Sequence, residues 1–156
     1  MLTLLSHPAI LVAHHEDLAG LDMATPEMDR LCRAILEATE SDSGLDTGRL
    51  KDHLVEKGFE ALYMRLTESA SLKSDWFAWP EAALVDAEKG WVQTLKRYRR
   101  ITTLQKEYEA LEDELSRNTT EECFSRLMAL QEEMQVNSGN ESDLEGYGLA
   151  SERPVT

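Results

Sequence analysis

This chain of 156 residues has little of what marks a β protein, a membrane protein or a disulfide-bonded protein. No segment of useful length alternates apolar and polar residues, so we expect an all-α fold. No apolar run approaches the roughly 18 residues that a membrane helix needs, and we expect no membrane partner. Only two cysteines are present, Cys32 and Cys123, far apart on predicted helices, which is typical of free thiols in a reducing cytoplasm.

The common catalytic and cofactor-binding motifs are also missing. There is no Gly-rich phosphate loop, no Cys-x-x-Cys pair, no nucleophile elbow and no Glu-x-x-His pair of a di-metal bundle. His14 and His15 are adjacent, so on a helix they point about 100° apart and cannot easily share a metal ion. We expect solvated or helix-capping histidines, no catalytic residue, no metal and no cofactor. A small enzyme that uses carboxylates and histidines stays an alternative.

Basic residues are the scarcer charge, since 16 Lys and Arg face 30 Asp and Glu and give a net charge of -14. Such a surface repels phosphates, so we expect a protein partner with a basic face and no direct binding of nucleic acid. One basic cluster stands on a predicted helix: Lys96, Arg97, Arg99, Arg100 and Lys106. We favour pairing of this cluster with acidic neighbours, with contact to an anionic partner as the alternative.

The first part of the chain carries signals of several short helices. One helix is predicted to begin near Pro8, and another at Thr25–Pro26, where threonine is a good N-cap and proline a good first residue. Gly58 is predicted to end a later short helix. A connection then contains three aromatic residues, which we expect to pack on a core: Trp76, Phe77 and Trp79.

A long helix followed by an antiparallel partner is the strongest pattern in the sequence. From Pro80 to Ser116 there is no proline and one glycine, which predicts a helix of about 36 residues, or about 54 Å. Apolar residues of its second half are spaced 3 and 4 apart: Ile101, Leu104, Tyr108, Leu111 and Leu115. Thr119 and Glu122 have the spacing of a capping box for a second helix. Its facing residues are Phe124, Leu127, Leu130 and Met134.

These patterns predict a helical bundle at residues 1–95, a projecting helical hairpin at residues 96–137 and a disordered acidic tail at residues 138–156. A two-helix hairpin has one seam and cannot cover all its apolar atoms, and exposed apolar area of this kind marks a contact site. We expect six side chains of the hairpin to supply buried area to a partner and two arginines to orient it: Tyr108, Leu111, Leu115, Phe124, Leu127 and Met128, with Arg117 and Arg126.

Several short segments occur in a familiar order. They are Leu4-Leu5-Ser6-His7-Pro8, Trp76-Phe77, Pro80-Glu81-Ala82-Ala83, Gly90-Trp91, Arg97-Tyr98-Arg99-Arg100, residues 120–127, Leu130-Gln131-Glu132-Glu133 and Leu144-Glu145-Gly146-Tyr147-Gly148. This order, which covers most of the chain, resembles the C-terminal helicase-binding domain of bacterial DnaG-type primases. The order of the features carries the resemblance.

The resemblance implies a helical subdomain followed by a helical hairpin that docks on the N-terminal domains of the replicative helicase DnaB. In the primosome, that contact couples RNA primer synthesis to fork unwinding during DNA replication. The zinc-binding and polymerase domains of such primases are absent here, so the chain alone is expected to be non-catalytic. Two alternatives stay open: the N-terminal domain of a replicative helicase, whose fold is similar, and an unrelated helical adaptor that dimerises through the hairpin.

Overall fold

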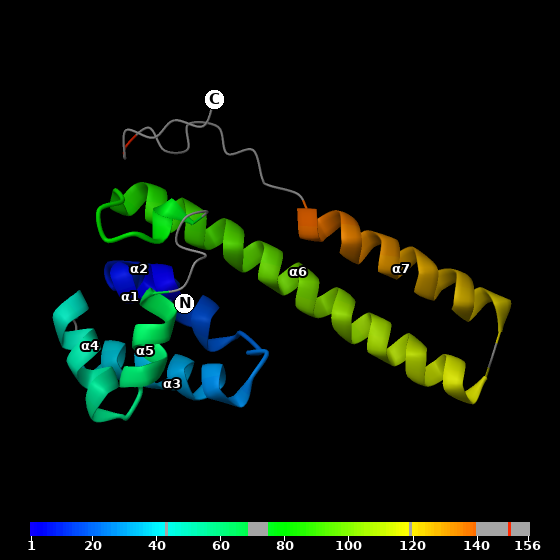
Figure 1. Cartoon of the computed structure of the whole chain (residues 1–156), viewed down its shortest axis with the longest axis horizontal. Helices are drawn as coiled ribbons and strands as arrows, with labels where there is room; N and C mark the ends of the chain where they lie inside the picture. Colours follow the sequence, from blue (N-terminus) through cyan, green and yellow to red (C-terminus); the bar gives the residue numbers. More distant parts are fainter. Residues whose placement is uncertain (43, 69–74, 119, 140–149, 151–156) are drawn as a thin grey trace. The chain divides into compact units, whose positions relative to one another are not determined.

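The computed structural model describes the chain except residues 43, 69–74, 119, 140–149 and 151–156. Within these limits all regular structure is helical and no strand is found, which confirms the predicted all-α fold (Figure 1). The chain divides into two compact units, a first that contains Met1–Val92 and a second that contains residues 93–139. The domain limits placed after residues 95 and 137, and the projection of the hairpin, stay predictions. Most of the predicted acidic tail lies outside the described residues.

The first unit is a bundle of short helices around an aliphatic core. Its elements are α1 (Leu2–Ser6), α2 (Ala9–Ala19), α3 (Pro26–Ser41), α4 (Thr47–Glu56), α5 (Glu60–Thr67), the 3-10 turn η2 (Trp76–Ala78) and the first turns of α6. Nine aliphatic side chains are fully buried in it: Leu4, Leu5, Ile10, Leu11, Leu18, Leu31, Ile35, Leu50 and Leu54. They come from α1, α2, α3 and α4. The core therefore lies where the apolar side chains of these four short helices meet.

Helix boundaries in this unit follow the local signals. The Met28 amide donates to Thr25 Oγ1 at 3.2 Å, which caps α3 where the sequence predicted. Past the end of α4, Gly58 has a φ of 82°, a conformation that glycine adopts easily and that L residues rarely adopt. Gly58 therefore ends the helix, as predicted. Helix α2 begins at Ala9, directly after Pro8.

The aromatic connection lies on the core, as expected. The 3-10 turn η2 packs against α1, and the half-buried rings of Trp76 and Phe77 meet edge to face at 6.5 Å. The Nε2 atom of His7 donates to the Trp79 carbonyl at 2.8 Å and fixes the end of the turn. The fully buried side chain of the turn is Ala78, however, and not one of its aromatics.

His14 departs from the solvated role that we expected for the histidines. Helix α2 is kinked there, since His14 has a φ of -124° and a ψ of 22°. Its Nδ1 lies 3.1 Å from Asp17 Oδ2, its Nε2 lies 2.9 Å from Glu88 Oε1, and its ring centroid lies 4.8 Å from that of Trp91. Burial alone would lower the pKa of His14, but the hydrogen bonds to the two carboxylates outweigh it, and the pKa is raised.

The predicted long helix and hairpin are both present. Helix α6 (Leu84–Arg117) has 34 residues, and α7 (Glu121–Gly139) runs antiparallel beside its second half (Figure 1). The long helix begins at Leu84 and not at Pro80, because Pro80 sits in a turn in which the Ala82 amide donates to the Trp79 carbonyl at 3.0 Å. Proline is tolerated in a first helical turn, so the sequence rule did not separate the two starts.

The start of α7 also differs from the expected capping box. The Cys123 amide donates to the hydroxyl of Thr120 at 3.2 Å, so Thr120 caps the helix, whereas Thr119 lies outside the described residues. Helix α7 continues to Gly139, past the predicted end of the hairpin. None of the described helices is long and apolar enough to cross a membrane.

Candidate partner-binding site

The hairpin of α6 and α7 holds together by a small core. Three side chains in it are buried, Leu104, Leu111 and Leu130, with exposed fractions of 7%, 6% and 8%. Leu127 and Met134 pack against them and are half-buried. A seam of this size stabilises two helices against each other but encloses little volume, so much of the apolar surface of the hairpin stays outside it.

An ion pair joins the two helices beside the seam. Arg100 Nη2 lies 2.9 Å from Glu133 Oε1, and both side chains are exposed. An exposed pair of this kind contributes about 0–1 kcal/mol, so it aligns the helices more than it stabilises them. Arg100, a member of the basic cluster, therefore pairs with an acidic residue, as we favoured from the sequence.

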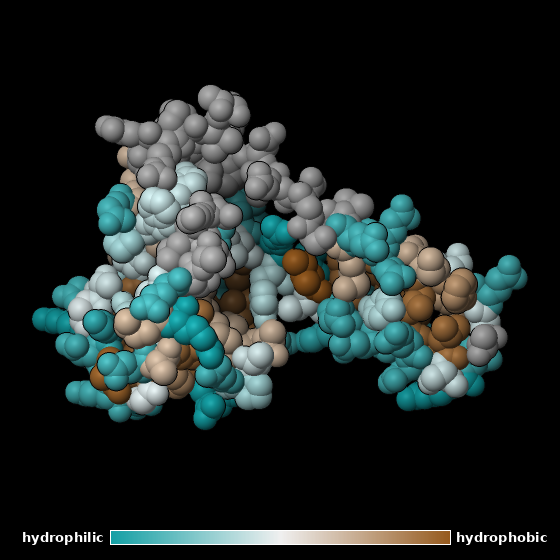
Figure 2. Space-filling view, in the orientation of Figure 1, coloured by the Kyte–Doolittle hydropathy of each residue, from teal (hydrophilic) through white to brown (hydrophobic). Residues whose placement is uncertain are grey.

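Two large apolar side chains of α7 lie outside the seam, and for Phe124 this corrects the prediction that it faces α6. Phe124 is 54% exposed and Met128 is 51% exposed. They are four positions apart, so they share one stripe of α7, next to the stripe that carries Leu127 and Leu130. Figure 2 shows apolar residues at the surface of this end of the hairpin, near the α6–α7 turn, among hydrophilic ones. An exposed apolar stripe beside a seam is a surface that a second helix can cover.

The eight residues predicted for partner binding fall into three groups. Leu111 is buried in the seam; Tyr108, Leu115 and Leu127 are half-buried; Arg117, Phe124, Arg126 and Met128 are exposed. Leu111 therefore supports the hairpin from inside, and the area that it offers a partner is small. Among these eight residues, the exposed apolar side chains, Phe124 and Met128, lie on α7. The role of these residues in binding stays a prediction.

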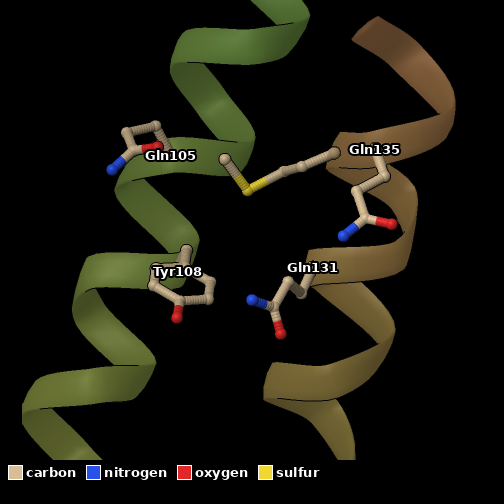
Figure 3. A pocket seen from close by; sticks show the side chains of 5 residues that line it. Gln105, Tyr108, Gln131 and Gln135 are labelled. Carbon is tan, nitrogen blue, oxygen red and sulfur yellow. The ribbon is translucent and has the colours of Figure 1, made fainter. Parts of the chain in front are cut away.

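A shallow pocket lies on the hairpin beside the seam (Figure 3). It has a volume of about 340 Å³ and is lined by Gln105 and Tyr108 of α6 and by Gln131, Met134 and Gln135 of α7. We call it the glutamine pocket. None of its five lining side chains is charged, although acidic residues surround it along both helices. Because Gln131 follows Met128 by three residues, the pocket continues the stripe of Phe124 and Met128.

Hydrogen bonds within α6 orient two of the lining side chains. Gln105 Nε2 donates to Glu109 Oε1 at 3.0 Å. The Tyr108 hydroxyl hydrogen-bonds to Glu112, and this bond, more than burial, raises the pKa of Tyr108. The phenol is thus held neutral and donates to the carboxylate, because an ionised carboxylate can only accept. The Oε1 of Gln105 and a lone pair of the Tyr108 oxygen remain as acceptors.

Sequence reasoning missed the glutamines of this pocket. Gln131 and Gln135 are spaced by four residues, and Gln105 precedes Tyr108 by three, so each pair shares one helix face. That spacing was the available signal. It has little weight alone, because glutamines are common on solvated helix faces, and only the register of the hairpin brings the two pairs together.

Among the described residues, no group of three or more His, Cys, Asp or Glu side chains could hold a metal ion. The cysteines that the structure describes, Cys32 and Cys123, are free, the first buried and the second half-buried. No protein-family model matches the chain, and no similar curated protein or solved structure is found.

Proposed function

We propose that this chain is the helicase-interaction domain of a bacterial DNA primase and docks on the N-terminal domains of the replicative helicase DnaB. The observation that carries the proposal is the exposure of Phe124 and Met128 on a hairpin with a seam of three buried leucines. The order of sequence features that resembles the primase domain supports the choice of partner. In this role the domain belongs to the primosome, acts in the cytoplasm and couples primer synthesis to unwinding.

The binding energy comes from covering the apolar stripe. Burying one Phe or Met side chain contributes about 1.5–3 kcal/mol before the costs of association are subtracted. Arg117 and Arg126, both exposed near the α6–α7 turn, orient the partner by charge. The net charge of -14 selects a partner with a basic face and raises the rate of encounter more than the affinity.

The proposed role needs no chemistry in this segment. The catalytic step of a primase, RNA polymerisation, belongs to another domain of that family, so we assign this chain no catalytic residue, cofactor or metal. Its contribution is to hold the primase at the replication fork. Tethering raises the local concentration of the primase near the unwound DNA.

A binding measurement tests the proposal. The affinity of the chain for the replicative helicase of the same organism is measured by calorimetry, first for the unaltered chain and then for Met128→Ala. We expect Met128→Ala to weaken binding by about 1 kcal/mol, because Met128 is 51% exposed and about half of its side chain is left for a partner to cover.

Met64→Ala is the matched control. Met64 is 44% exposed on α5 in the first unit, so the substitution and the exposure are similar and only the location differs. Equal affinities of the unaltered chain and Met128→Ala would contradict docking through the hairpin. Absence of binding by the unaltered chain would contradict the choice of partner.

Self-association through the same stripe is the second candidate, because Phe124 and Met128 could equally cover each other in a second copy of the chain. Sedimentation at micromolar concentration separates the two. A stable dimer that Met128→Ala dissociates favours a dimerising adaptor, whereas a monomer that binds the helicase favours the primase domain.

A further inference from the structure

A second pocket, which we call the bundle pocket, is lined by residues of α2 and α3 and by residues that flank these helices. It has a volume of about 330 Å³. Its apolar lining consists of the buried Pro8 and Leu11, the half-buried Leu45 and the exposed Val12. Val12 is 74% exposed, the largest exposed fraction among the large apolar side chains that the structure describes. A concave surface with an apolar lining and a few polar groups is the usual form of a binding site.

The charged side chains of the bundle pocket are acidic. Glu40 and Asp42 line it, and no Lys or Arg is among its described lining residues. Asp42 already has a counter-charge, because its Oδ2 accepts from Arg49 Nη1 at 2.7 Å. The side chain of Glu40 is 71% exposed, and its Oε1 lies 3.7 Å from His15 Nε2, beyond hydrogen-bond distance. Glu40 is therefore the carboxylate of this pocket that can receive a cation.

His15 leaves a second polar group unsatisfied beside Glu40. Its Nε2 is buried and makes no hydrogen bond with a described residue, although buried polar atoms are generally hydrogen-bonded in folded proteins. A neutral imidazole with its proton on Nδ1 offers Nε2 as an acceptor. The Nε2 of His15 and the Oε1 of Glu40 then form a pair of acceptors, which suits a cation with several N–H donors.

We propose that the bundle pocket receives an arginine side chain of a protein with a basic face. The aliphatic stem of the arginine covers Val12 and Leu45, and its guanidinium donates to Glu40 and His15. A guanidinium has several donors in one plane and is more weakly hydrated than an ammonium group, so arginine suits a partly apolar pocket better than lysine. The net charge of -14 favours a basic partner. The inference goes beyond the proposed function, because this contact lies on the bundle and not on the hairpin.

The first test titrates the full, isotope-labelled chain with small mimics of side chains at neutral pH and follows the amide signals by NMR. With n-propylguanidinium, the mimic of arginine, we expect saturable shifts at Val12, His15, Glu40 and Leu45 and a dissociation constant in the millimolar range, as for a ligand of so few atoms. Two further probes should bind at least about threefold more weakly. They are n-butylammonium, the mimic of lysine, and n-propanol, which has the stem without the charge.

The second test repeats the n-propylguanidinium titration on three variants. Glu40→Gln should weaken binding about fivefold, because it removes the charge that the guanidinium meets. Val12→Ser should weaken it about threefold, because it removes apolar area that the stem covers. Glu16→Gln is the matched control, since it makes the same change of charge at an exposed position of α2 outside the pocket, and its affinity should be unchanged. Far-UV circular dichroism verifies that each variant keeps its helices.

Three results would overturn the inference. Shifts that do not saturate, or that Glu16→Gln reduces as much as Glu40→Gln does, would mean general attraction of a cation to an acidic surface. Equal binding of n-butylammonium and n-propylguanidinium would refute the choice of arginine. Pocket signals that stay unmoved by n-propylguanidinium would mean that Glu40 and His15 serve only each other. Because these titrations contain no helicase, their failure leaves the proposed function standing, and absence of helicase binding leaves this inference standing.

Discussion

The bundle and the hairpin differ in how completely each encloses its apolar side chains. In the bundle, Leu31, Leu50 and Leu54 are 0% exposed, whereas the most buried residue of the hairpin seam, Leu111, keeps 6%. The bundle surrounds its core with helices from several directions, but the hairpin has only two helices and one seam. The difference lies in the depth of the two cores: the bundle encloses several aliphatic side chains completely, whereas each buried leucine of the hairpin seam keeps some exposure.

The largest expected effect is a core substitution in the bundle. Leu31→Ala should lower the free energy of unfolding by about 2–5 kcal/mol, because it removes fully buried methyl groups and leaves a cavity. Leu130→Ala makes the same change in the hairpin seam and should cost less, since water can reach the vacated space between only two helices. Urea unfolding followed by circular dichroism measures both. Equal losses would contradict the comparison between a closed and an open core.

The second-largest expected effect is a pH dependence of the free energy of unfolding that comes from the contacts of His14 in the bundle. Both ring nitrogens lie within hydrogen-bond distance of a carboxylate, Asp17 on α2 and Glu88 on α6, so the arrangement favours the doubly protonated ring. The pKa of His14 is raised in the folded chain. Its stabilisation is therefore fully present below the unfolded pKa of about 6.5 and is lost as the pH rises through the folded pKa.

His14→Gln tests this dependence. The difference in free energy of unfolding between the unaltered chain and the variant should be about 1 kcal/mol at low pH, where the bonds are charge-assisted, and smaller at high pH. Unfolding by urea at a series of pH values measures it, and an NMR titration of His14 gives the pKa directly. His15→Gln is the matched control, since its Nε2 lies 3.7 Å from Glu40 Oε1, beyond hydrogen-bond distance. A difference that is constant with pH would refute the charged contact.

Local signals predicted much of this fold. Thr25 with Pro26 and Gly58 act within a few residues, and the structure places helix boundaries accordingly. Of the α6 seam predicted from Ile101 to Leu115, Leu104 and Leu111 are buried against α7, whereas Ile101 is 36% exposed. Where two neighbouring residues can both cap a helix, the capping rule does not tell which of them is the N-cap. Thr119 and Thr120 can both cap a helix, and the structure uses Thr120.

Contacts between residues far apart in the chain could not be predicted from the sequence. His14 and Glu88 are 74 positions apart, so no helical spacing links them, and the contact exists only because α6 packs beside α2. The glutamine pocket depends in the same way on the register of α6 and α7, which the Arg100–Glu133 pair reports. The exposed stripe was predicted in outline, but its concentration on Phe124 and Met128 required the packing of the seam to be known.

The smallest expected effect is the most direct test of an open hairpin. Phe124→Ala should change the free energy of unfolding of the free chain by no more than about 0.5 kcal/mol, because its ring is already 54% exposed and lies outside the seam. Urea unfolding measures this value alongside that of Leu130→Ala, which removes a seam residue from the same helix. A loss for Phe124→Ala as large as that for Leu130→Ala would mean that Phe124 belongs to the fold, and the apolar stripe would then have no area to give to a partner.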